Sequence, residues 1–99
     1  EVFALTDLIA ERVRKNGAAT LTSIGAIAAR SRIADQDDAA LPAEAMIAEL
    51  AADNRKLIDA IREAKAAAGA AGDNATEGAA DDWTDQAEQR VWFLASLLA

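Results

Sequence analysis

The sequence predicts an all-α protein, because apolar residues recur at helical spacing through most of its 99 residues. No segment shows the alternation of apolar and polar residues that is typical of a β-strand. The periodic segments are separated by Gly17, Pro42 and Gly72, residue types that commonly mark helix ends. Together these observations favour long helices arranged as a bundle.

The first predicted helix covers residues 1–16. Leu5, Ile9 and Val13 recur four positions apart and form an apolar stripe. Basic residues crowd the end of this segment, where the helix dipole favours cations, and Gly17 supplies the usual stop signal. No capping residue stands at the start of the segment, so we expect it to be the last part of a longer helix.

A short connection, a short helix and an acidic loop follow. Thr22 or Ser23 can cap the short helix. Residues 34–40 show no periodicity and are rich in aspartate, which predicts a solvated loop. Pro42 then suits the first position of the next helix, because the missing N–H of proline costs nothing there.

Two long helices complete the prediction. The first runs to about Ala68, and Asn54 interrupts its apolar stripe, either as a buried specificity residue or, as we favour, at the edge of the stripe. Asp73 or Asn74 caps the second. The stripe of the first consists of Ile47, Leu50, Ala51, Leu57, Ile58, Ile61 and Ala64. The stripe of the second consists of Ala80, Trp83, Ala87, Val91, Leu94 and Leu98.

The composition excludes several classes of protein. The chain has no cysteine, so it forms neither a disulfide framework nor a thiolate metal site, and it has no histidine. Its net charge of −7 repels nucleic acid and attracts cations. No apolar run is long enough to span a membrane, and no signal-peptide pattern opens the sequence. The scarcity of large apolar side chains favours oligomerisation.

Asp7 and Glu11 are the candidate metal ligands. They stand four positions apart on one face of the first helix, which places their Cβ atoms roughly 6 Å apart. This spacing has two interpretations: a solvated face neutralised by nearby arginine and lysine, which spacing alone favours, or a pair of oxygen ligands for a cation such as iron. Helices of a bundle often project such ligands inward.

The segment from Asp7 to Gly17, Asp-x-x-Ala-Glu-Arg-x-Arg-x-x-Gly, resembles the second-helix motif of the Dps family of ferritin-like mini-cages. The resemblance continues in order along the chain. Residues 20–28 resemble the short connecting helix of that family, residues 46–54 and 61–64 its third helix, and residues 72–76 and 88–94 its fourth. A match that extends over nearly the whole chain favours the metal interpretation of Asp7 and Glu11.

The resemblance implies a ferritin-like four-helix bundle, to which this chain supplies the second half of helix B, the short BC helix, and helices C and D. Residues 1–99 are then the C-terminal part of one domain, with helix A and the first half of helix B upstream. It also implies a cytoplasmic homo-oligomer, a dodecamer. Such a cage oxidises Fe(II) with hydrogen peroxide or oxygen, stores the Fe(III) product and thereby protects DNA.

In the Dps family the ferroxidase site lies between two subunits. One subunit provides two histidines, and the other provides the two carboxylates that Asp7 and Glu11 match. The resemblance therefore assigns iron binding and catalysis to Asp7 and Glu11, with the histidines in upstream sequence. The alternative is an inactive cage subunit or a non-catalytic helical interaction module. DNA binding in the family often relies on basic tails, and this acidic chain does not support it.

Asp73, Glu77 and Asp81 form a second candidate site. Their spacing of four places them on one face at the start of the last helix. In Dps-like cages the start of this helix lines an acidic channel, so the resemblance implies that iron enters past these three side chains. A solvated helix face with an ordinary acidic cap explains the same spacing, and the sequence leaves both interpretations open.

Overall fold

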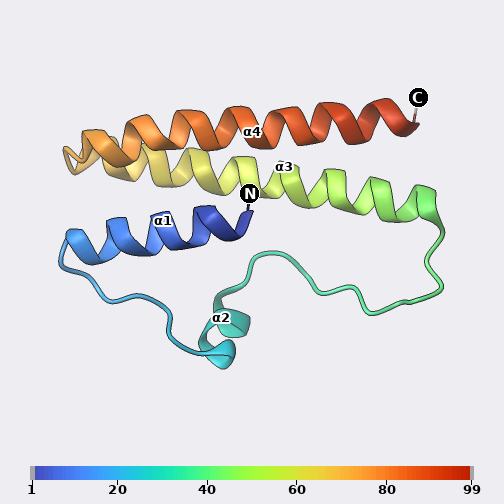
Figure 1. Ribbon diagram of the computed structural model, residues 1–99, viewed down its shortest axis with the longest axis horizontal. Coiled ribbons are helices and arrows are strands. Elements are labelled where there is room, and N and C mark those ends of the chain that lie inside the picture. The colour runs from blue at the N-terminus through green and yellow to red at the C-terminus, as the bar shows by residue number, and fades with distance from the viewer. Residues whose placement is uncertain (1, 99) are drawn as a thin grey trace. The chain divides into compact units, whose positions relative to one another are not determined.

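The computed structural model describes residues 2–98 and the side chains of residues 4–98. This part of the chain contains four helices and no strand. They are α1 (Val2–Lys15), α2 (Ile24–Arg30), α3 (Ala43–Ala70) and α4 (Asn74–Leu98), as Figure 1 shows. The chain divides into two compact units, residues 1–32 and residues 33–99. The predicted all-α class, with two long helices and a short helix in the connection, is confirmed.

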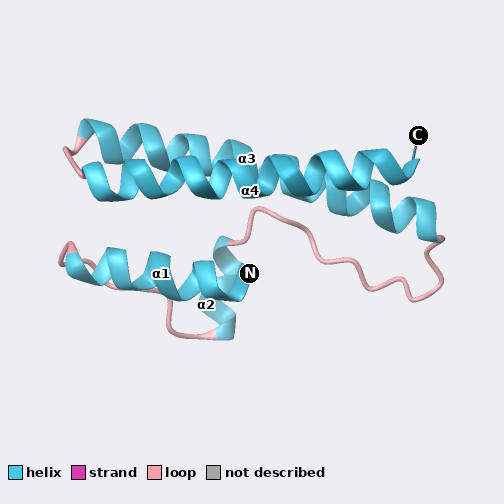
Figure 2. Cartoon of the chain, turned by 45° about the horizontal axis from the view of Figure 1, so that its top comes forward, coloured by secondary structure: helices cyan, strands magenta, loops and turns pink. Residues whose placement is uncertain are grey.

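The second unit is a hairpin of α3 and α4, which lie side by side along their length in both views (Figures 1 and 2). The two helices are antiparallel because only a short turn joins them. Alanine side chains and three larger ones, Ile58, Ile61 and Trp83, are buried in the hairpin. The buried residues of the hairpin are Ala51, Ile58, Ile61, Ala68, Ala80, Trp83 and Ala87.

A polar contact crosses the same interface. The Nε–H of Arg90 donates to Oδ1 of Asn54 at 2.9 Å, and Nδ2 of Asn54 donates to the carbonyl oxygen of Leu50 at 2.8 Å. Both Asn54 and Arg90 are half-buried. Asn54 therefore lies at the edge of the apolar stripe, as favoured from the sequence, and it also ties α3 to α4.

The turn between α3 and α4 satisfies the backbone groups at both helix ends. Gly72 adopts a φ of 75°, a conformation that glycine reaches without steric cost. The amide of Asp73 then donates to the carbonyl of Ala68 at 2.8 Å, the longer bond of a Schellman motif. At the start of α4, Oδ1 of Asp73 accepts from the Thr76 amide at 3.2 Å. Of the two predicted caps, Asp73 is the one used.

The first unit contains α1, a connection and α2. Gly17, with a φ of 85°, ends α1 in the same way that Gly72 ends α3. Ser23 caps α2, because its Oγ accepts from the Ala26 amide at 3.0 Å. The short helix contains no buried residue, and Ile24 is 89% exposed. This unit thus presents apolar side chains that its own residues do not cover.

Several details differ from the sequence expectations. Pro42 was predicted to be the first residue of the helix, but it is the N-cap, one position before α3 begins. The helix α3 extends to Ala70, two residues beyond the predicted end. Leu50 and Ala64, which belong to the predicted apolar stripe of α3, and Leu98, which was predicted in the buried stripe of α4, are exposed. A single neighbouring helix covers only part of a wide apolar face. Helical periodicity therefore predicts more buried residues than one helix–helix contact buries. The predicted first residue of α1, Glu1, lies outside the described residues.

Candidate functional site

Asp7 and Glu11 lie on consecutive turns of α1, and both side chains are exposed. The helix forms here because apolar residues recur on one face of α1, which leaves the carboxylates on a more polar one. Asp7 also borders a largely apolar groove of about 680 Å³ within the first unit. The groove is lined by Thr6, Asp7, Ile9, Ala10, Val13, Ala19, Thr20, Leu21, Ile27 and Arg30.

These two carboxylates offer oxygen ligands, the type that hard and borderline cations accept. No group of three or more metal-ligating side chains comes together within residues 2–98. Two carboxylates by themselves do not make a complete ligand set for a cation. A cation bound by them needs further ligands from water, from a second chain or from sequence outside the 99 residues.

The three residues of the second candidate site, Asp73, Glu77 and Asp81, make different contacts. Asp73 caps α4, and its Oδ2 also accepts from the Thr76 hydroxyl at 2.5 Å. Glu77, in the first turn of α4, borders a small groove with Arg62 and Lys65 of α3. Asp81 pairs with Lys65 across the hairpin. The structure thus places the three acidic residues at the start of α4, with cationic side chains of α3 next to two of them.

The ion pair between Lys65 and Asp81 shifts the pKa of Lys65. The hydrogen bond to Asp81 and the negative charge of Asp81 raise the pKa of Lys65 above its ordinary value of 10.5, with a smaller contribution from Glu77. Lys65 is 42% exposed and Asp81 66% exposed, so solvent screens this pair strongly.

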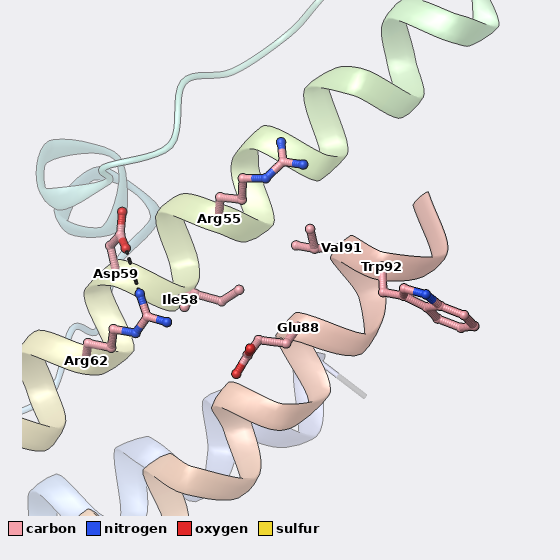
Figure 3. A pocket seen from close by; sticks show the side chains of 7 residues that line it. All are labelled: Arg55, Ile58, Asp59, Arg62, Glu88, Val91 and Trp92. Carbon is pink, nitrogen blue, oxygen red and sulfur yellow. Dashed lines mark ion pairs between the residues drawn. The ribbon is translucent and has the colours of Figure 1, made fainter. Parts of the chain in front are cut away.

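The sequence did not predict a groove that lies between α3 and α4. It has a volume of about 440 Å³ and lies over Ile58 and Val91 (Figure 3). Arg55, Asp59 and Arg62 of α3 border one side, and Glu88 and Trp92 of α4 border the other. The sequence signals were the positions of Arg55, Asp59 and Arg62 on one face of α3 and the Glu88–Trp92 spacing on α4. Because neither pattern is specific by itself, only the packing of the hairpin brings them together.

The charges in this groove are not all paired. Arg62 contacts Asp59 at 3.6 Å on its own helix. Within residues 2–98, neither Arg55 nor Glu88 has an ion-pair or side-chain hydrogen-bond partner. Trp92 points away from α3 and is 69% exposed (Figure 3).

No helix among the described residues is both long enough and apolar enough to cross a membrane. Searches of curated proteins and of solved structures returned no match to this chain. A family model described as a ferritin-like domain matches residues 1–99. That match covers every residue of the sequence, and it agrees with a structure in which residues 2–98 form helices without strands. The chain belongs to the ferritin-like family, a family associated with the oxidation and storage of iron.

Proposed function

We propose that this chain is a subunit of a Dps-like dodecamer, with upstream helices that complete its bundle. In this proposal the assembly oxidises Fe(II), stores the Fe(III) product in the cytoplasm and protects DNA from peroxide damage. The carrying observation is the ferritin-like match over residues 1–99, together with two carboxylates at the required spacing on α1. The ordered resemblance of all four helices to Dps segments supports the narrower assignment.

Asp7 and Glu11 bind iron in this proposal, and iron is the substrate rather than a resident cofactor. Two carboxylate oxygens from one helix stabilise the higher charge of Fe(III) more than that of Fe(II), which favours oxidation. Each Fe(II) ion loses one electron, and one hydrogen peroxide molecule accepts two electrons and two protons to give water. In this proposal the remaining ligands come from a neighbouring subunit, as the Dps resemblance implies; residues 2–98 contain no group of three or more ligating side chains.

The test replaces both carboxylates by their neutral isosteres, Asp7→Asn and Glu11→Gln, in the complete assembly. We expect oxidation of Fe(II) by peroxide to slow by at least ~10-fold, because even the loss of a residue that only hydrogen-bonds to a metal ligand costs that much. The matched control is Asp59→Asn with Glu63→Gln, an exposed carboxylate pair with the same spacing on α3. Oxidation at the parent rate in the Asp7/Glu11 variant would exclude the assignment.

Asp73, Glu77 and Asp81 steer iron toward the interior in this proposal without taking part in the oxidation. Their position in the first turns of α4 supports it, since three copies around an axis would concentrate negative charge. The pairing of Asp81 with Lys65 reduces that charge and counts against a strong effect. DNA binding by this acidic chain has no support from its net charge of −7.

A second candidate function is an inactive cage subunit or a non-catalytic helical interaction module. Two observations favour it: the 99 residues contain no histidine, and exposed isoleucines occur on α2. Such a chain would bury its apolar faces against partner helices without oxidising iron. An assembly that forms normally and shows no peroxide-dependent loss of Fe(II) above a protein-free control would favour this function.

A further inference from the structure

Asn16 is followed directly by Gly17, and this pair of residues allows a reaction of the backbone. A backbone amide nitrogen can attack the side-chain carbonyl carbon of a preceding asparagine, which forms a five-membered imide and releases ammonia. A side chain on the following residue crowds this attack, and glycine has none. Gly17 is the one glycine of the 99 residues that comes directly after an asparagine or an aspartate. Sequence alone therefore singles out Asn16 among the asparagines of the chain.

The structure leaves this pair of residues exposed where α1 ends (Figure 1). A Cβ atom built on Gly17 would meet no atom within 4 Å beyond its immediate chain neighbours. One interaction opposes the attack, because the Gly17 amide donates to the carbonyl oxygen of Arg14 at 2.9 Å. The reaction thus needs the release of this amide.

Release of the Gly17 amide requires only the last turn of α1 to open. Its bond to Arg14 and the bond from the Ala18 amide to the Val13 carbonyl, at 3.2 Å, form a Schellman motif. Opening of a fraying helix end costs almost no free energy, whereas opening inside a packed helix costs up to the global free energy of unfolding. Asn54 belongs to the second class, because it lies within α3 and accepts a hydrogen bond from α4.

We propose that Asn16 is a site of spontaneous deamidation in the folded chain. The Gly17 nitrogen bonds to Cγ of Asn16, the Cγ–Nδ2 bond breaks, and the amide proton of Gly17 ends on the leaving ammonia. Water then opens the imide: cleavage of the bond to Cγ gives aspartate, and cleavage of the bond to the backbone carbonyl carbon gives isoaspartate. Water is the only reagent, and no electron is transferred. The reaction uses no proposed iron ligand, so it is independent of the ferroxidase proposal.

Both products change the end of α1. Each adds a negative charge where the helix dipole favours cations. Isoaspartate also leads the backbone through its side-chain carbons, so an additional carbon atom separates Lys15 from Gly17 and shifts the Schellman bonds. We therefore expect the amides of Gly17 and Ala18 to lose their protection from hydrogen exchange in the isoaspartate form. Equal protection in the parent and isoaspartate forms would contradict this effect on the turn.

The first test incubates the folded protein in neutral buffer, well below its unfolding temperature, and follows each asparagine by peptide mapping with mass spectrometry. We expect Asn16 to lose its amide at least ~10-fold faster than Asn54, because a difference of ~1.4 kcal/mol in opening free energy alone gives that factor. Asn74 is the matched control, since it is also exposed but precedes Ala75. An isoaspartate-specific methyltransferase should label the peptide that contains Asn16. Equal loss of the amide at Asn16 and Asn74 would overturn the proposal.

The second test, Gly17→Asn, separates the effect of the glycine from that of the exposed helix end. Gly17 has a φ of 85°, and asparagine tolerates this left-handed conformation better than most residues, so the turn should persist. Because the added Cβ crowds the attack, we expect deamidation of Asn16 to fall to the level of Asn74. Fragment ions distinguish Asn16 from the introduced asparagine. If Asn16 reacts as fast in the variant as in the parent, the glycine does not determine the reaction and the proposal is wrong.

Discussion

The ammonium group of Lys65 is held by the Asp81 carboxylate, and this contact sets a pH dependence at the scale of one residue pair. The hydrogen bond and the opposite charge raise the pKa of Lys65 in the folded state above its ordinary value of 10.5. The folded protein therefore binds this proton more tightly than the unfolded chain does. The stabilisation is complete below the ordinary pKa and disappears as the pH rises through the raised pKa of the folded state.

We predict that Asp81→Asn flattens this part of the stability profile. As the pH rises above about 10.5, the parent protein should lose more of its free energy of unfolding than the variant does. The effect is small, because the pair is exposed to solvent. Urea unfolding at a series of alkaline pH values measures it, with Asp82→Asn on the same helix as the control. Parallel pH profiles for the parent and Asp81→Asn would contradict the predicted role.

At the same scale, the sequence predicted where the candidate ligands stand but not what completes their site. The spacing of Asp7 and Glu11 placed them on one helix face, because helical geometry is local. Residues 2–98 contain no group of three or more ligating side chains, and the ligands that we propose from a neighbouring subunit are not encoded in a local pattern. The ion pair of Asp81 with Lys65 could not be predicted from the sequence either, because it depends on how α3 and α4 align.

At the scale of the helix, local signals predicted the element ends well. Ser23 caps α2, Asp73 caps α4, and Gly17 ends α1, each by a contact within a few residues. The side of each long helix that is buried was harder to predict. Leu50 belongs to the apolar face of α3 but is 52% exposed, because α4 covers only one flank of that face. Periodicity identifies an apolar face, whereas burial depends on the neighbour.

The hydrogen bond between Arg90 and Asn54 gives a prediction at this scale. Asn54→Ala removes the acceptor at 2.9 Å and leaves the Nε–H of Arg90 half-buried without it. We expect the free energy of unfolding to fall by ~0.5–1.5 kcal/mol, the net contribution of a typical hydrogen bond, because Arg90 is only half-buried. Urea unfolding measures the change, and Gln89→Ala, an exposed position on α4, is the control. If Asn54→Ala is no less stable than Gln89→Ala, this bond does not hold the hairpin together.

At the scale of the whole molecule, the net charge of −7 gives the chain a field that attracts cations. Composition alone predicted this field, and the family match supports iron as the relevant cation. How the field is distributed over an assembly depends on which faces meet. The start of α4, with Asp73, Glu77 and Asp81, is where we propose that it acts on iron uptake.

The test neutralises the three residues with Asp73→Asn, Glu77→Gln and Asp81→Asn in the complete assembly. Asparagine keeps the cap of α4, because asparagine and aspartate are about equally good N-caps, so the helix should remain intact. Losing Asp81 also exposes the positive charge of Lys65, which repels Fe(II) further. We therefore expect slower iron uptake at low salt. We also expect the uptake rate to depend less on salt, because salt screens the attraction between Fe(II) and the three carboxylates, which the variant has lost. A control with Glu63→Gln, Asp82→Asn and Asp85→Asn changes the net charge by the same amount at other exposed positions. If both variants slow uptake equally, the effect comes from overall charge, and the start of α4 has no special part in guiding iron.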